Sequence, residues 1–191
     1  MLDQLQMLDG EILLWLQEFV RCPVLDAVLI PFTALGNSGL LWIVLSVLML
    51  CFPKTRKAGA LTLLALLVGA LATNLTLKPW AARPRPWLWV EGLVPMLSPG
   101  DPYSFPSGHT TAAFAAAGIW CRTLPRRWMR VAALIQAVVM AFSRLYAGVH
   151  FPTDVLGGLC VGLLGSWLVW HGYGLWRERS GAKSDRFDNR A

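Results

Sequence analysis

Residues 58–77 read AGALTLLALLVGALATNLTL, a run of twenty residues without a charged side chain. A helix needs about 20 consecutive apolar residues to cross the hydrocarbon core of a bilayer, which is about 30 Å thick. Lys78 and Pro79 follow directly, and proline disfavours helical geometry in the residue before it. The stretch therefore predicts a membrane-spanning helix that ends at Lys78.

The rest of the chain has the same character. Of its 191 residues, 55% are hydrophobic and 15% are charged, and the mean hydropathy is +0.51. A soluble domain carries about 25% charged residues. The apolar residues occur in blocks with charges between them, the pattern expected when lipid is the solvent. We therefore predict an all-α integral membrane protein that forms one domain over residues 1–191.

The block boundaries predict about six transmembrane helices in one bundle. An amphipathic segment over residues 1–21 precedes them, and a polar cytoplasmic tail over residues 177–191 follows. In the N-terminal segment, Leu5, Leu8 and Ile12 recur at helical spacing, which fits an interfacial helix or the first turns of the first span. The predicted spans are residues 23–35, 40–52, 58–77, 107–120, 131–142 and 153–176.

The basic residues predict how the bundle is oriented. Twelve of the 17 Lys and Arg lie in two loops and the tail, which six spans place on one face: Lys54, Arg56, Lys57, Arg122, Arg126, Arg127, Arg130, Arg177, Arg179, Lys183, Arg186 and Arg190. Basic loops face the cytoplasm, so the sequence predicts a multi-pass protein of the inner or plasma membrane. The net charge of +6 is explained by basic residues that set the membrane topology and attract anionic lipid head groups. We therefore expect no nucleic-acid partner.

Three polar clusters fall on the opposite face, where the charge rule gives them no topological role. Such residues at a membrane boundary indicate function. Alternating span direction brings the clusters to one side of the bilayer, so we expect them to converge. They are Lys78 with Arg85-Pro86 (K-x6-R-P), Pro106-Ser107-Gly108-His109 (P-S-G-H), and Ser143-Arg144, His150 and Asp154 (S-R-x5-H-x3-D).

The cationic members of these clusters favour a bound phosphate. Arg85 and Arg144 can each bind phosphate oxygens through two N–H groups, and Lys78 adds a point charge. Ser107 and Gly108 open a predicted helix, whose free backbone N–H groups attract an anion. The sequence thus predicts a phosphate site built from several elements.

The two histidines add the groups that a hydrolytic reaction requires. Asp154 follows His150 by four residues, so its carboxylate can fix one imidazole nitrogen and leave the other as a nucleophile. His109 lies in the first turn after Ser107 and could protonate a leaving oxygen. Taken singly, each cluster also fits a structural role, such as a helix cap.

At these positions the sequence resembles the type 2 phosphatidic acid phosphatases, or lipid phosphate phosphatases, whose three motifs occur here in order and at the family's spacing. The resemblance covers residues 78–154 by motif and the whole chain by layout of spans. Vanadium haloperoxidases share the motifs, but a haloperoxidase would require a larger soluble chain and bound vanadate.

The resemblance implies a role for each motif residue. His150 would attack phosphorus and become phosphorylated, Asp154 would orient His150, and His109 would act as the general acid and then help to activate water. The phosphate would be held by Lys78, Arg85, Ser107, Gly108 and Arg144. The resemblance implies that neither a metal nor another cofactor is required.

The substrate is expected to be a lipid phosphate, with the active site on the periplasmic or extracellular face. Undecaprenyl pyrophosphate, the cell-wall carrier, is the preferred substrate, and phosphatidylglycerophosphate or phosphatidic acid is the alternative. A lipid or anion transporter would also place basic groups at a membrane edge, but it offers no reason for a His-Asp pair beside a phosphate site. No oligomeric state is predicted.

Other polar residues are expected to be passive. We interpret Glu91 and Asp101 as solvated loop residues and His171 as structural, and Arg83 belongs to none of the three clusters. The four cysteines, Cys22, Cys51, Cys121 and Cys160, lack metal-binding spacing and are interpreted as small apolar residues.

Overall fold

The computed structural model describes residues 2–188, and side chains over residues 4–180. The described chain is helical apart from its connections, with one isolated bridge between Pro84 and Tyr103. The N-terminal elements are α1 (Leu2–Trp15), which continues as a π-helical segment (Leu16–Val20), α2 (Pro23–Leu35), a short 3-10 turn (Asn37–Gly39) and α3 (Leu40–Leu50). The remaining helices are α4 (Arg56–Ala70), a π-helical continuation (Leu71–Leu77), α5 (Lys78–Ala81), a 3-10 turn (Pro86–Leu88), α6 (Gly108–Thr123), α7 (Arg127–Tyr146) and α8 (Pro152–Asp188).

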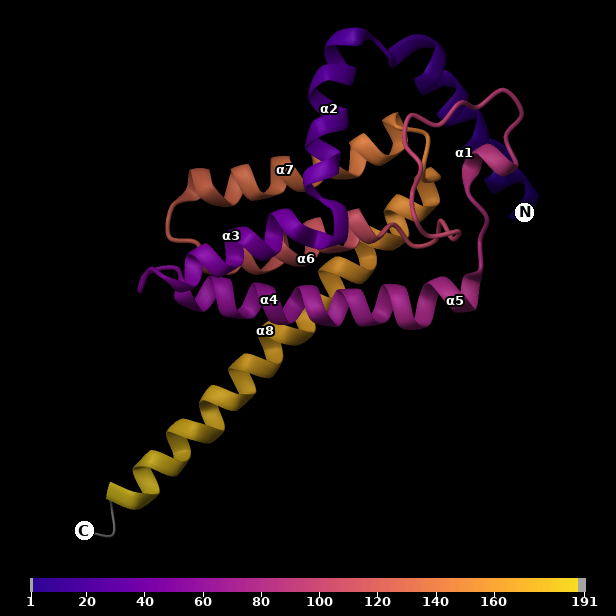
Figure 1. The fold of residues 1–191 in the computed structure, drawn as a ribbon. Coiled ribbons are helices and arrows are strands. Elements are labelled where there is room, and N and C mark those ends of the chain that lie inside the picture. Colours follow the sequence, from indigo (N-terminus) through magenta and orange to yellow (C-terminus); the bar gives the residue numbers. More distant parts are fainter. Residues whose placement is uncertain (1, 189–191) are drawn as a thin grey trace.

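Helix α6 forms the centre of the bundle. It packs against α4, α7 and α8, and every residue from Ala113 to Trp120 is buried. Figure 1 shows α3, α4, α6 and α7 side by side, with α8 crossing them and its C-terminal half leaving the bundle. The core therefore forms around a helix that is rich in small residues and is covered by other helices.

Glycines let α8 approach α6 closely. A Cβ at Gly158 would lie 2.6 Å from the carbonyl oxygen of Ser107, and one at Gly162 would lie 2.5 Å from that of Thr111. Small residues at a helix interface allow backbones to approach in this way. The contact also brings the start of α6 to the start of α8, where the Ser107 N–H donates to the carbonyl oxygen of Asp154 over 3.0 Å.

Large apolar side chains cover the outer surface of the bundle. Three helical stretches are long and apolar enough to cross a membrane: Arg56–Ala81, Arg127–Tyr146 and Pro152–Ser180. Residues on one face of each of these stretches are exposed, including Leu64, Leu67, Leu71, Leu75, Val131, Leu134, Ile135, Val138, Leu156, Leu163 and Leu164. A surface of this kind suits a lipid environment.

The count of six spans stays a prediction. Helices α2 and α3 meet at a bend of 54° and could together make a fourth span. The bend lies between the predicted spans 23–35 and 40–52, where Ser38 and Gly39 have positive φ angles of 53° and 73°. Helix α6 has only 16 residues, which is about 24 Å at a rise of about 1.5 Å per residue.

Both ends of the chain are helical over the described residues. In the N-terminal segment, the apolar residues Leu5, Leu8 and Phe19 are exposed, while the acidic Asp9 is buried beside Leu13. The buried face of α1 thus carries Asp9 and Leu13, and Ile12 packs against the same core cluster. The predicted polar tail begins as a continuation of α8, which stays helical to Asp188; residues 189–191 lie outside the described part.

Candidate active site

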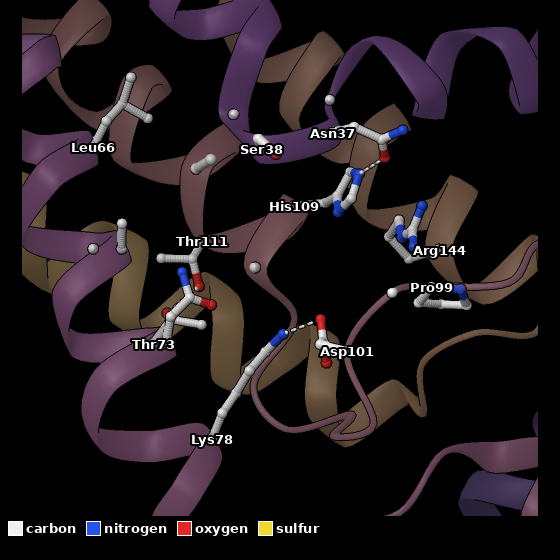
Figure 2. Close-up of a pocket in the computed structure, with 18 of the residues that line it drawn as sticks. Asn37, Ser38, Leu66, Thr73, Lys78, Pro99, Asp101, His109, Thr111 and Arg144 are labelled. Atoms are coloured by element: carbon white, nitrogen blue, oxygen red, sulfur yellow. Dashed lines mark hydrogen bonds and ion pairs between the residues drawn. The ribbon is translucent and has the colours of Figure 1, made fainter.

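The three predicted clusters meet at one end of the bundle. Six of the eight predicted residues line a single cavity of about 780 Å³: Lys78, Arg85, Gly108, His109, Arg144 and His150. Figure 2 shows Lys78 and His109 reaching this space from opposite sides. Ser107 and Asp154 are fully buried and stand behind the cavity wall, joined by the backbone hydrogen bond described above.

Arg85 is the most enclosed cation of the site, with 2% of its surface exposed. Its Nη1 donates to the carbonyl oxygen of Val149 over 2.9 Å and lies 3.1 Å from Nε2 of His150. A guanidinium group carries only hydrogen-bond donors, so Nε2 of His150 must be the acceptor in this hydrogen bond. The neutral imidazole of His150 therefore carries its proton on Nδ1.

His150 faces Asp154 through that second nitrogen. Nδ1 of His150 lies 3.7 Å from Oδ2 of Asp154, and Asp154 Oδ2 also accepts from the Phe151 backbone N–H over 2.8 Å. Burial, aided by the charges of Arg85 and Arg144 and opposed by the nearby Asp154 carboxylate, lowers the pKa of His150 to about 4. The imidazole is thus neutral at physiological pH, with an unprotonated Nε2 directed at the cationic part of the cavity.

Asp101 was predicted to be a solvated loop residue, and the structure shows that this prediction is wrong, because its carboxylate binds two cations of the site. Its carboxylate accepts from Lys78 Nζ over 2.8 Å and from Arg85 Nη2 over 2.7 Å, although 46% of the side chain is exposed. Burial acts to raise the pKa of Asp101, but hydrogen bonds and charge from Lys78 and Arg85 outweigh it and hold the pKa below its ordinary value. The carboxylate therefore bridges two of the predicted phosphate-binding cations, as Figure 2 shows for Lys78. Glu91, in contrast, is exposed.

Arg83 is the second correction. Although it belongs to none of the three clusters, Arg83 donates through Nη1 to Asp154 Oδ1 over 2.6 Å and through Nη2 to Asp9 Oδ2 over 2.8 Å. Asp9 comes from α1, which the motifs do not include. No spacing pattern in the sequence links Asp9 to Arg83, 74 residues away, so only the fold reveals this group.

The bend between α2 and α3 supplies further contacts that sequence reasoning missed. Nε2 of His109 donates to Oδ1 of Asn37 over 3.1 Å, a contact drawn in Figure 2. Arg144 donates through Nη1 to the hydroxyl of Thr33 over 2.8 Å, while its Nε has no hydrogen-bond partner among the described residues. Buried polar atoms are usually paired, so the unpaired Nε fits a cation prepared to bind a further acceptor.

Ser107 and Gly108 form the start of α6 as predicted. The Ser107 hydroxyl accepts from the Thr110 backbone N–H over 3.5 Å and from the Thr110 hydroxyl over 3.0 Å, which makes Ser107 the N-cap. A Cβ added to Gly108 would meet no atom within 4 Å, because Gly108 faces the cavity. The helix N-terminus therefore opens onto the same space as the three cations.

The cavity is not wholly polar. Away from the cations it is lined by apolar side chains of α3 and α4, namely Ile43, Leu63, Leu66 and Leu67. The three leucines lie on α4, about three to four helical turns before Lys78. One continuous space thus joins a cationic end to an apolar one.

The remaining predicted residues lie apart from this cavity. Nδ1 of His171 is 3.0 Å from the carbonyl oxygen of Trp167 in the preceding turn of α8. The four cysteines are unpaired. Over the described residues, no group of three or more His, Cys, Asp or Glu side chains is arranged to hold a metal ion.

Comparison with known proteins defines the class to which this fold and site belong. The family model described as the PAP2 superfamily matches residues 59–178. The chain belongs to the PAP2 superfamily, as the resemblance of its motifs predicts.

Three relatives illustrate the range of the match. The chain is 37% identical over 127 residues to an undecaprenyl-diphosphatase of Sulfolobus acidocaldarius, covering 66% of this chain and 59% of that protein. It is 35% identical over 162 residues to phosphatidylglycerophosphatase B of Bacillus subtilis, covering 78% of this chain and 76% of the relative. The crystal structure of a transmembrane PAP2-type phosphatidylglycerolphosphate phosphatase from Bacillus subtilis superposes with a TM-score of 0.71 at 32% identity, covering 88% of this chain and 85% of that one.

Proposed function

We propose that this protein is a lipid phosphatase that removes phosphate from a membrane lipid through a phosphohistidine intermediate on His150. The observation that carries the proposal is the single cavity with a cationic end at Lys78 and Arg85 and an apolar end at Leu63 and Leu66. A phosphate group suits the first end, and a hydrocarbon chain suits the second.

In the first half of the reaction, Nε2 of His150 attacks phosphorus. An N–P bond forms, the P–O bond to the leaving oxygen breaks, and His109, which is in its imidazolium form when the anionic phosphate is bound beside it, donates a proton to that oxygen. The contact between Arg85 and Nε2 is exchanged for one between Arg85 and a phosphate oxygen, which frees the nucleophile. Asp154 faces the positive charge that develops on the imidazole and stabilises it.

In the second half, water attacks the phosphohistidine. His109 accepts a proton from the water, the N–P bond breaks, and inorganic phosphate leaves with His150 restored. Lys78, Arg85, Arg144 and the N-terminus of α6 oppose the negative charge on the phosphorus oxygens in both steps. Such preorganised charge usually supplies the largest part of catalysis. No step requires a metal ion or a cofactor.

Undecaprenyl pyrophosphate is the substrate that we favour. A relative bears the name undecaprenyl-diphosphatase, and the apolar part of the cavity can take a long hydrocarbon chain. Phosphatidylglycerophosphate is the second candidate, because a relative and a similar crystal structure are both named for that lipid. Phosphatidic acid stays a third possibility.

We propose that the active site faces the periplasm or the cell exterior. The α3–α4 and α6–α7 connections lie at the end of the bundle away from α5, as Figure 1 shows. Seven basic residues lie in these connections or in the adjoining turns of α4, α6 and α7. The positive-inside rule assigns that end to the cytoplasm.

The test is phosphate release by the purified protein in detergent with EDTA present. Undecaprenyl pyrophosphate, phosphatidylglycerophosphate and phosphatidic acid are compared side by side, with His150→Ala as the control. We expect release that persists in EDTA and is lost in the variant, and the ranking of kcat/KM identifies the lipid. Release by neither protein would contradict the proposal and favour a lipid or anion transporter, whereas release that EDTA abolishes would contradict the metal-free mechanism.

A further inference from the structure

Asp154 has an ionic partner outside the three motifs. Arg83 Nη1 donates to its Oδ1 over 2.6 Å, while its Oδ2 accepts from the Phe151 N–H and faces His150. The two carboxylate oxygens are thereby divided between a cation and the histidine. Rotation of this carboxylate would break the bond to Arg83, so Arg83 holds Asp154 in the orientation that presents Oδ2 to His150.

Arg83 is itself held from three sides. Nη2 donates to Asp9 Oδ2 over 2.8 Å, and Nη1 donates to the Thr153 hydroxyl over 2.6 Å. The guanidinium also lies over the ring of Phe151, 4.1 Å from its centre. A planar guanidinium fixed by two ion pairs and an aromatic face has little freedom to turn.

Asp9 holds the beginning of α8 as well. Its Oδ1 accepts from the Thr153 backbone N–H over 3.2 Å, and its Oδ2 accepts from the Thr153 hydroxyl. Thr153 lies in the first turn of α8, where backbone N–H groups lack partners within the helix. Asp9 thus fixes the backbone that carries Asp154.

Burial makes these charges depend on one another. The side chains of Asp9 and Asp154 are 4% and 0% exposed, and that of Arg83 is 20% exposed. Removal of one partner from a buried ion pair leaves an uncompensated charge and is strongly unfavourable. The three residues should therefore respond to substitution as one unit.

We propose that Asp9 and Arg83 are positioning residues for the His150–Asp154 pair, so that α1 forms part of the catalytic apparatus. This helix lies outside residues 59–178, which the family model matches. The proposal rests on the proposed function, in which His150 is the nucleophile. It also gives the burial of Asp9, on the packed face of α1, a functional reason.

The charges that face His150 set the direction of the expected effects. Arg85 from the connection after α5, Arg144 from α7, His109 from α6 and Asp154 from α8 act on its imidazole, and Arg83 and Asp9 act through Asp154. Loss of the Arg83 cation should raise the pKa of His150, because Asp154 is less compensated. Loss of the Asp9 anion should lower it.

The experiment compares Arg83→Gln, Asp9→Asn and the double variant with Glu11→Gln. Glu11 is exposed on the same helix, so its substitution removes the same charge without touching the network. We expect Arg83→Gln to lower kcat by about 10- to 100-fold, because a displacement of a reacting group by about 1 Å can cost about 100-fold in rate, with KM changed less than about twofold. Asp9→Asn, which is nearly isosteric, should lower kcat in the same sense, and Glu11→Gln should not.

The pH response separates positioning from a merely structural role. Both the acid limb of kcat/KM and the NMR titration of the His150 ring should move to higher pH in Arg83→Gln and to lower pH in Asp9→Asn, with the double variant between them. The proposal would be overturned by wild-type kcat in both single variants. It would also be overturned if the pKa of His150 moved in the same direction in both of them. The NMR titration needs no substrate, so it tests the positioning even if the wild-type protein releases no phosphate, a result that would count against the proposed function instead.

Discussion

At the scale of single residues, His150 combines burial with three neighbouring charges. Burial and the cations Arg85 and Arg144 disfavour the imidazolium, whereas Asp154 favours it, and the net pKa of His150 is about 4. The nucleophile is therefore unprotonated without any need for a base to remove a proton first. Its reactivity depends on the phosphate displacing Arg85 from Nε2.

This balance predicts that His150 does not titrate near neutral pH. Because its pKa is lowered, the imidazole stays neutral as the pH falls from 7 to 5 and gains a proton only around pH 4. NMR of the ring signals in detergent, assigned by their loss in His150→Ala, measures this directly, and the chain has only three histidines. A midpoint near the ordinary value of about 6.5 would contradict the balance of charges described here.

Asp101 stands where a phosphate would bind. Its carboxylate binds both Lys78 and Arg85. An incoming phosphate must therefore displace the carboxylate, and the negative charge of Asp101 then repels the bound phosphate. We expect Asp101→Asn to bind inorganic phosphate more tightly, with a Ki for product inhibition lowered by about tenfold, which corresponds to about 1.4 kcal/mol. Glu91→Gln, in the same connection but exposed, is the matched control. An unchanged or higher Ki for Asp101→Asn would show that the carboxylate does not compete with phosphate.

At the scale of elements, the site depends on how α6 and α8 meet. Their beginnings carry Ser107 and Asp154, and the glycines of α8 set the separation of the two helices. Gly162→Ala should push them apart, since its Cβ would lie 2.5 Å from the Thr111 carbonyl oxygen. Overpacking of this kind costs about 1–3 kcal/mol, so the variant should melt at a lower temperature in detergent.

The same helix provides a control for that substitution. A Cβ at Gly172 would meet no atom within 4 Å, and alanine is the better helix former by about 1 kcal/mol. Gly172→Ala should therefore melt at the wild-type temperature or above it. If both variants lowered the melting temperature equally, close packing at Gly162 would not be the cause.

The bend between α2 and α3 is the other element that builds the site. The break between the predicted spans 23–35 and 40–52 marks its position in the sequence, but nothing in the sequence indicates its contact with His109. Periodicity and turn chemistry locate such a break, whereas the direction in which Asn37 points is set by the tertiary packing of α2 on α7.

At the scale of the whole molecule, the sequence predicted the helical membrane class and the convergence of the motif residues. Both follow from local signals: apolar block length, and fixed spacing within motifs on successive antiparallel spans. Asp9, Asn37 and Asp101 were missed because their contacts join segments with no spacing relation to the motifs. Helix α6 shows the same limit for spans, since its alanines face protein rather than lipid and its length alone does not identify a transmembrane helix.

The covalent intermediate tests the central proposal most directly. A lipid substrate labelled with ³²P in the phosphate to be transferred is mixed with the protein and quenched within one turnover, and the labelled peptide is identified. We predict an acid-labile, alkali-stable phosphoramidate on His150 that is absent from His150→Ala. Label on His109, or rapid phosphate release without any labelled histidine, would contradict the account.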